Sequence, residues 1–135
     1  MVKITGKYEG KLRTTAVHGP SGMTLLTDAP LDNHGRGEAF SPTDLLATSL
    51  GCCMLTIMGI TAERLGLDLS TTTFEVTKEM SATLPRRVAK LTVRFTMPAA
   101  LSPENRTRLE QAAKTCPVHH SLHPDVICDI GFEYR

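Results

Sequence analysis

Four cysteines and a cluster of histidines are the residues of this sequence whose types and spacing could do chemistry. Cys52 and Cys53 are adjacent in the mostly apolar stretch "SLGCCMLT", residues 49–56. Cys116 lies in "TCPVHHSLHP", and Cys128 lies close to the C-terminal end of the sequence. A deprotonated thiol is a nucleophile and a metal ligand, whereas a buried neutral thiol is a small core residue. The first question is therefore which of the four is a reactive thiol.

Cys52 and Cys53 fall on different faces of the helix that this stretch predicts, because successive helical residues are about 100° apart. Cys53 shares an apolar stripe with Leu46, Leu50, Ile57 and Ile60, whereas Cys52 shares a small and polar stripe with Ser49, Thr56 and Gly59. Burial preference alone makes Cys53 a core residue. An apolar surround and a position in the middle of a helix both disfavour a thiolate. A reactive Cys53 therefore requires a nearby cation, for which arginine is the natural candidate.

Cys116 has the opposite character, because Pro117 predicts that it caps the start of a short helix. Backbone N–H groups and the helix dipole stabilise a thiolate at such a position, so this cysteine is expected to be the easier one to ionise. His119 and His123 add two possible metal ligands, so a zinc site is a second hypothesis. The usual pattern of two short-spaced ligand pairs is absent. Cys128 lies on the apolar face of a predicted strand and is expected to be structural.

The segment that carries Cys53 begins with a clear helix start. In "SPTD", Ser41 is a suitable N-cap, Pro42 suits the first helical position, and Asp44 stands where the acid of a capping box belongs. The helix is predicted to run to about Leu65, where Gly66 provides the stop. This length would span a small domain.

The other segments predict strands and shorter helices. Before the long helix, "MTLLTD" at 23–28 predicts a strand. After it, strands at 72–80 and 87–97 join through a turn around Pro85, followed by a helix from Ser102 and Pro103 to about Thr115. The predicted apolar strand faces are Ala89, Leu91, Val93, Phe95 and Met97, and then Val126, Cys128, Ile130, Phe132 and Tyr134. This order predicts one α+β domain over residues 1–135, with helices packed on a mainly antiparallel sheet.

Composition limits the class of protein and the cellular compartment in which this chemistry is expected. With 41% hydrophobic residues, 21% charged residues and a net charge of +1, the chain predicts an ordinary globular protein without a nucleic-acid or anionic-membrane partner. The N-terminal "MVKITGKYEG" contains no apolar signal segment. These features predict a cytoplasmic protein, and in that compartment cysteines are more often reduced, catalytic or metal-bound than joined in structural disulfides.

Two motifs together resemble the OsmC/Ohr family of osmotically induced and organic hydroperoxide resistance proteins. "FSPTDLLATSLGCCMLT" resembles the family's entry to a long central helix, with Cys53 at the position of the reactive cysteine. "TCPVHHSL" resembles the motif of the family's second cysteine, at Cys116. The order of elements also agrees, so the resemblance extends over essentially the whole chain.

The resemblance implies an OsmC-like α+β fold and an intertwined homodimer, with active sites at the subunit interface. It also implies a thiol-dependent peroxidase. The thiolate of Cys53 attacks the peroxide, Cys116 condenses with the resulting sulfenic acid, and an external dithiol reduces the disulfide without metal or cofactor. The apolar stripe beside Cys53 favours organic hydroperoxides as substrates.

One departure from the family pattern concerns the charges that activate the cysteine. Family peroxidases carry a glutamate ten residues before it, paired with an arginine, and this sequence has Thr43 there. Asp44 and Glu38 are the possible substitutes for that glutamate. Arg36, in "GRGEAF", is the preferred arginine, and Arg13 is the alternative.

Because the usual glutamate is replaced by Thr43, a non-catalytic function is kept as an alternative. The alternative function is a redox sensor or small-molecule binder of the same fold, with the metal-binding domain as a further possibility. Cys52 also replaces the small residue that usually precedes the reactive cysteine, and its role is left open.

Overall fold

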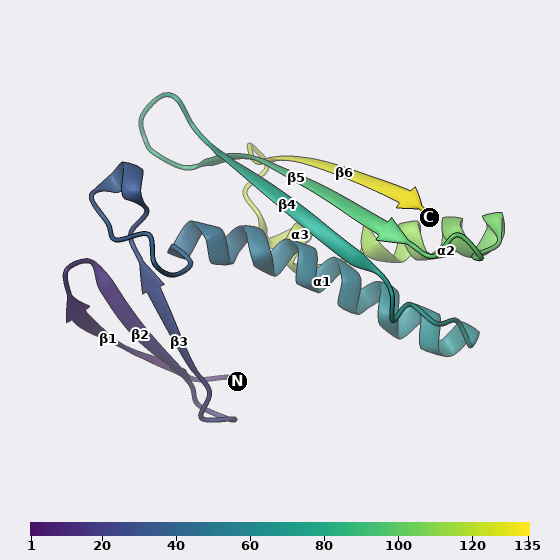
Figure 1. Cartoon of the computed structure of the whole chain (residues 1–135), viewed down its shortest axis with the longest axis horizontal. Helices are drawn as coiled ribbons and strands as arrows, with labels where there is room; N and C mark the ends of the chain where they lie inside the picture. The colour runs from purple at the N-terminus through teal and green to yellow at the C-terminus, as the bar shows by residue number, and fades with distance from the viewer. The chain divides into compact units, whose positions relative to one another are not determined.

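The computed structural model describes all residues from Met1 to Arg135. The chain divides into two compact units, Met1–Leu46 and Ala47–Arg135, which we call the N-terminal and C-terminal units. The boundary falls within the long helix α1, Pro42–Leu65, whose first residues belong to the N-terminal unit (Figure 1). Each unit is described by itself.

The N-terminal unit is a three-stranded antiparallel meander. Its strands are β1 (Ile4–Gly10), β2 (Arg13–His18) and β3 (Thr24–Asp28), followed by the short 3-10 helix η1 (Leu31–Asn33). A two-residue turn at Lys11 and Leu12, both with positive φ, joins β1 to β2. Turns of this kind match the twist of a hairpin and fix its register. In the next strand pair, Arg13 stands opposite Asp28.

The predicted start of the long helix is confirmed in detail. The Ser41 backbone N–H donates to Asp44 Oδ2 at 2.8 Å, and the Asp44 N–H donates to Ser41 Oγ at 3.1 Å. This reciprocal pair is a capping box, which satisfies N–H groups that the helix itself leaves unpaired. The predicted end at Leu65 is also confirmed, and Gly66 follows it with a positive φ of 66°.

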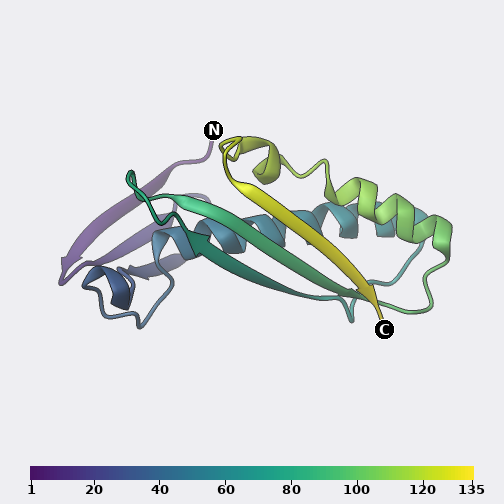
Figure 2. The same cartoon turned by 90° about the horizontal axis from the view of Figure 1, so that it is seen from above.

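The C-terminal unit is a three-stranded mixed sheet covered by helices. Strands β4 (Thr73–Met80) and β5 (Val88–Met97) are antiparallel, and β6 (Ile127–Tyr134) pairs with β5 in parallel. The crossover between β5 and β6 contains α2 (Pro103–Ala113) and α3 (Pro117–Ser121). The helices pack on the same face of the sheet (Figure 2). The predicted α+β class is confirmed.

The core of this unit joins the helices to the apolar faces of the strands. The predicted face of β6 is confirmed as its sheet side, and so is that of β5 from Leu91 to Met97, with Leu91, Val93 and Phe95 almost completely buried. Ala89 was wrongly predicted, because the pairing with β4 shifts register at this end and places Val88 in the core instead. The other face of the sheet is polar and includes the ion pair between Arg94 and Asp129, 3.1 Å apart. Apolar residues therefore alternate with polar ones as a half-buried strand requires.

The apolar stripe of α1 that contains Cys53 is not the face on which the helix is buried. The buried residues of the helix are Ala47, Leu50, Gly51, Met54, Met58 and Ala62, so that Leu50 alone of the predicted stripe is buried. Leu46 and Ile60 are exposed, and Cys53 and Ile57 are half-buried. The physical reason is that α1 is apolar around most of its circumference, so periodicity does not identify the face that meets the sheet.

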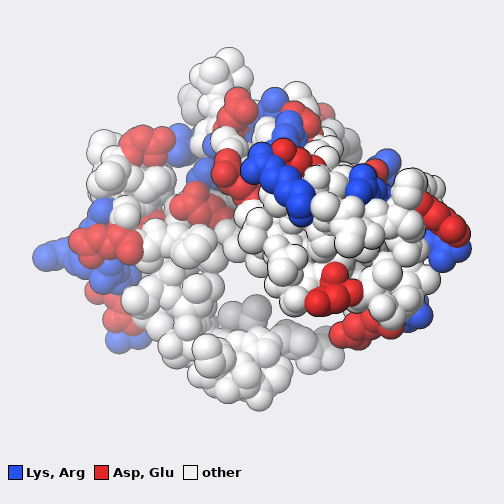
Figure 3. All heavy atoms as spheres, turned by 45° about the vertical axis from the view of Figure 1, so that its right-hand side comes forward, with Lys and Arg blue, Asp and Glu red and all other residues white.

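By length and composition, α1 is apolar enough to cross a membrane. The core helix of a soluble protein meets the same criterion, and Leu50, Met54 and Met58 of α1 are in the core of the C-terminal unit. Basic and acidic side chains are interspersed on the face of the molecule drawn in Figure 3 and do not gather by sign.

Gly51 lets α1 approach β4 closely, which leads to a prediction. A Cβ at this position would lie 2.5 Å from Phe74 Cε2 and 2.9 Å from Val76 Cγ2. We expect Gly51→Ala to lower the free energy of unfolding by about 1–3 kcal/mol, because two packed side chains must move. Gly59→Ala is the matched control, since a Cβ there meets nothing within 4 Å.

Urea denaturation of the two variants tests this prediction. Gly59→Ala should stabilise the protein by roughly 0.5–1 kcal/mol, as alanine does inside a helix. Equal effects of the two substitutions would contradict the close packing of α1 on β4.

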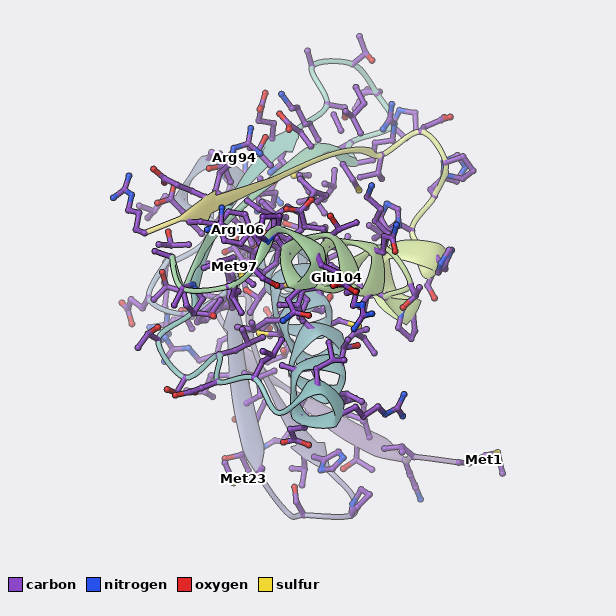
Figure 4. All side chains as sticks on the ribbon, turned by 90° about the vertical axis from the view of Figure 1, so that its right-hand side faces the viewer. Met1, Met23, Arg94, Met97, Glu104 and Arg106 are labelled. Atoms are coloured by element: carbon purple, nitrogen blue, oxygen red, sulfur yellow. The ribbon has the colours of Figure 1, made fainter.

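Arg106 attaches α2 to the end of the sheet. Its side chain donates to the carbonyl oxygens of Leu101 and Ala99 at 2.9 and 2.7 Å, and it lies over the ring of Tyr134 at 4.1 Å. Figure 4 labels Arg106 and Met97, and Met97 is the residue that pairs with Tyr134 in the sheet. This anchor fixes the start of the crossover that carries Cys116.

Candidate active site

The structure brings the thiols of Cys53 and Cys116 into hydrogen-bonding contact. Cys53 lies in the middle of α1 and is half-buried, whereas Cys116 is the N-cap of α3 and is completely buried. Both are free cysteines. Two thiols in contact, contributed by distant parts of the chain, can be oxidised to a disulfide by a two-electron oxidant.

The predicted position of Cys116 is confirmed, but the expectation that it ionises easily was wrong. Burial raises the pKa of the Cys116 thiol, and the neighbouring thiol of Cys53 raises it further. The N–H groups of His119 and Val118 act in the opposite direction, with His119 N 3.5 Å from Cys116 Sγ. The pKa is raised overall, because complete burial penalises the charged form more than the helix start favours it.

The side chain of Cys53 is a hydrogen-bond partner of Cys116. Three arginines of this unit are bonded elsewhere: Arg94 to Asp129, Arg106 to backbone carbonyls, and Arg108 to Glu104.

The N-terminal unit holds an arginine between two carboxylates. Arg13 Nε and Nη2 donate to the two oxygens of Asp28 at 2.7 and 2.8 Å, and Nη2 also donates to Glu38 Oε2 at 3.0 Å. Asp28 is 1% exposed, and it also accepts the Glu38 backbone N–H at 3.2 Å. The hydrogen bonds from the guanidinium of Arg13 hold the pKa of Asp28 below its ordinary value. Paired geometry of this kind fixes the plane of the guanidinium.

Arg36, the preferred arginine of the sequence analysis, is placed differently. Its charge contributes to lowering the pKa of Asp28, after the larger effect of the Arg13 hydrogen bonds. Of the possible glutamate substitutes, Asp44 takes part in the capping box, and Glu38 binds Arg13. Thr43 Oγ1 lies 3.2 Å from Ser41 Oγ at the start of the helix.

Sequence reasoning missed Asp28. The residue ends the predicted strand "MTLLTD", where an aspartate usually indicates a turn. Its partner becomes visible only when β2 and β3 are paired in register, because the pairing places Arg13 opposite it. A prediction of the strand register would therefore have identified it.

The structure does not bring the proposed metal ligands together. No group of three His, Cys, Asp or Glu side chains in residues 1–135 is arranged to hold a metal ion. His123, the proposed ligand furthest along the chain from Cys116, instead lies 3.7 Å from a carboxylate oxygen of Asp125. The spacing that suggested ligands from Cys116, His119 and His123 does not bring them together.

The two remaining cysteines lie outside the thiol pair. Cys128 packs against the core from β6, as predicted, and burial raises the pKa of its thiol. Cys52 is exposed, and its backbone carbonyl accepts the hydroxyl of Thr56 at 2.8 Å.

The fold and the site define an α+β protein with a pair of thiols between its long helix and the cap of a short one. The family model of OsmC-like proteins matches residues 35–130, so the chain belongs to the OsmC family. A solved structure from Psychrobacter arcticus 273-4, provisionally described as an osmotic stress induced and detoxification response protein, is 48% identical. That match covers 98% of this chain and 94% of the other, with a TM-score of 0.90.

More distant structures share the fold. An organic hydroperoxide resistance protein from Legionella pneumophila is 15% identical over 98% of this chain and 96% of its own, with a TM-score of 0.78. One from Elizabethkingia anophelis is 12% identical over 100% and 96%, with a TM-score of 0.79. Among proteins with curated descriptions, none matches this sequence.

Proposed function

We propose that this protein is a thiol-dependent peroxidase that reduces organic hydroperoxides through Cys53 and Cys116. The observation that carries the proposal is the contact between these two thiols, one half-buried and one completely buried. Membership of the OsmC family supports it, as do the hydroperoxide resistance proteins that share the fold.

The reaction has three steps. The Cys53 thiolate attacks the peroxide, the O–O bond breaks, and Cys53 becomes a sulfenic acid while the alkoxide leaves and takes up a proton as the alcohol. The Cys116 thiol then condenses with the sulfenic acid, forming the disulfide and releasing water. An external dithiol returns both cysteines to thiols and is itself oxidised to a disulfide. No metal or cofactor takes part.

An apolar surface beside Cys53 favours organic substrates over hydrogen peroxide. Ile57 is half-buried and Ile60 is 43% exposed on the same stripe of α1. Such a stripe can bury the alkyl group of a hydroperoxide, and each buried CH₂ contributes about 0.8 kcal/mol to binding. The proposal includes a homodimer in the cytoplasm, without nucleic acid or membrane as partner.

Mapping the thiols after peroxide treatment tests the proposal. Reduced protein receives one equivalent of cumene hydroperoxide, is quenched with an alkylating reagent, and is examined by peptide mass spectrometry. We expect a Cys53–Cys116 disulfide in the wild type and in Cys52→Ser, and none in Cys53→Ser. Four alkylated thiols and no disulfide in the wild type would contradict the proposal.

A redox sensor is the second candidate, and the buried state of Cys116 favours it. Because burial raises the pKa of this thiol, its condensation with a sulfenic acid is slowed at neutral pH. A sensor would form the same disulfide but would consume peroxide slowly in the presence of excess dithiol. Steady-state consumption of cumene hydroperoxide with dithiothreitol separates the two functions.

A further inference from the structure

The condensation of Cys116 with a sulfenic acid at Cys53, which is the second step of the proposed function, requires an acceptor for the proton of Cys116. Cys116 is completely buried, and burial raises the pKa of its thiol, so the sulfur carries its proton at neutral pH. The thiolate is the nucleophilic form, so this proton must leave the sulfur as the disulfide forms. The acceptor must be reachable from an enclosed sulfur.

His119 lies in the same helical turn as Cys116. Cys116 is the N-cap of α3, and His119 is the third residue after it. The backbone N–H of His119 donates to Cys116 Sγ, with 3.5 Å between the nitrogen and the sulfur. The Cα–Cβ bonds of a helix are tilted toward its N-terminus, so the imidazole of His119 is directed back toward the turn that begins at Cys116. The side chain of a capping box reaches the N-cap residue from this same position.

The Nδ1 atom of His119 is enclosed and has no hydrogen-bond partner in the protein. The N–H of Cys116, which is the usual partner of a side chain at this position, donates instead to the carbonyl oxygen of Ala113 at 3.2 Å. Enclosed polar atoms without a partner cost stability and are few in native proteins. With its proton on Nε2, the imidazole presents Nδ1 as an acceptor. His119 therefore provides an unused acceptor within one helical turn of the buried thiol.

The other titratable side chains near Cys116 are less suited to this role. Cys53 acts on the Cys116 thiol through a hydrogen bond and through its charge, but it is the reaction partner itself. His120, whose ring centroid lies 5.9 Å from that of His119, is exposed, and the side chain of His123 is 69% exposed. An exposed imidazole exchanges protons with water rather than with an enclosed sulfur.

We propose that His119 accepts the proton of Cys116 when the disulfide with Cys53 forms. The Cys116 sulfur attacks the Cys53 sulfur, the S–O bond of the sulfenic acid breaks, and the proton of Cys116 passes to His119 Nδ1. The leaving hydroxide takes a proton back from the imidazolium and departs as water, which restores the neutral imidazole. In the reduced protein the Cys116 thiol is bonded to that of Cys53. The contact with Nδ1 forms as the imidazole turns toward the sulfur, since catalytic hydrogen bonds often tighten only in the reacting complex.

A single turnover in a Cys52→Ser background separates the two steps. Reduced protein receives one equivalent of cumene hydroperoxide without dithiol, and samples quenched with dimedone and an alkylating reagent are examined by peptide mass spectrometry. His119→Asn keeps a polar atom at the place of Nδ1 but accepts no proton. At pH 7 this variant should form the sulfenic acid at the wild-type rate and the disulfide about 100-fold more slowly, as the loss of a general base predicts. His120→Asn, the matched control at the adjacent exposed imidazole, should form both at wild-type rates.

The dependence on pH distinguishes proton transfer from a structural role. Above the raised pKa of Cys116 the thiol ionises without an acceptor, so the rates of the wild type and of His119→Asn should converge as the pH rises beyond the ordinary thiol pKa of about 8.5. A loss of rate that stays constant over this range, an equal loss in His120→Asn, or a wild-type rate in His119→Asn at pH 7 would overturn the proposal. If thermal unfolding shows that His119→Asn does not fold, His119→Gln replaces it with the same expected results.

Oxidation by diamide keeps this proposal distinguishable from the proposed function on which it rests. Diamide joins two thiols in a disulfide and is itself reduced to a hydrazine, and Cys116 must lose its proton in this reaction too. If peroxide produces neither sulfenic acid nor disulfide in the wild type, the peroxidase proposal fails, and the diamide rates of the wild type and His119→Asn still decide the role of His119. If peroxide produces the disulfide at equal rates in both proteins, the peroxidase proposal stands and the role of His119 is rejected.

Discussion

In a Cys116→Ser variant, consumption of cumene hydroperoxide with dithiothreitol should be much slower than in the wild type, because the sulfenic acid at Cys53 has no partner thiol in the protein and must react with the external dithiol directly. The structure provides a matched control in Cys128, a half-buried thiol that packs against the same core and whose pKa is raised by burial alone. Cys128→Ser should therefore retain multiple turnovers with dithiothreitol. Peroxide assays over time measure both variants. Sustained turnover by Cys116→Ser at the wild-type rate would contradict the two-cysteine mechanism.

The condensation of Cys116 with the sulfenic acid at Cys53 should depend on pH in the wild type. Burial raises the pKa of Cys116 above its ordinary value, so at neutral pH the residue is protonated and becomes nucleophilic as the pH rises. The rate of disulfide formation is therefore expected to increase with pH beyond the range in which an ordinary thiol has already ionised. Rapid-quench alkylation after a single peroxide addition gives this rate.

Phe95→Ala should produce the largest loss of stability, about 3–5 kcal/mol in the free energy of unfolding. Phe95 is 1% exposed at the centre of the C-terminal unit, with its ring centroid 5.3 Å from that of Phe132 and 6.1 Å from that of Phe74. Removal of the ring leaves a cavity and ends both ring contacts. Leu84→Ala is the control, because Leu84 is 90% exposed in the turn between β4 and β5.

Urea denaturation compares the two variants. Leu84→Ala should stay within about 0.5 kcal/mol of the wild type, as exposed substitutions usually do. A loss below about 1 kcal/mol in Phe95→Ala, which is less than a buried aromatic ring contributes, would contradict its central place in the core.

Local signals in the sequence predicted the elements well. The start of α1 was predicted from Ser41, Pro42 and Asp44, because capping chemistry depends on residues within one turn of the helix. The same applies to the cap of α3 at Cys116. The apolar face of β5 was also predicted, because alternation with period two leaves a strand only one face to bury.

The errors and omissions concern interactions between elements. The face of α1 that packs on the sheet was not predicted, because Gly51 and Met54 define it through contacts with strands that lie far along the chain. Arg13 and Asp28 are 15 residues apart, and their pairing depends on strand register. The expected ionisation of Cys116 failed for a similar reason, since burial by distant segments outweighs its local helix start.

A disulfide between Cys53 and Cys116 would also affect the stability of the folded protein, because it would close the length of chain that lies between them. A disulfide here would close a loop that contains β4, β5 and α2, and so nearly half of the molecule. In the chain-entropy model, a loop of this length lowers the entropy of the unfolded chain enough to favour the folded state by about 4 kcal/mol. Oxidation would then make the protein harder to unfold and reduction would make it easier. The lifetime of the folded protein under proteolysis would thus follow the peroxide and dithiol concentrations around it.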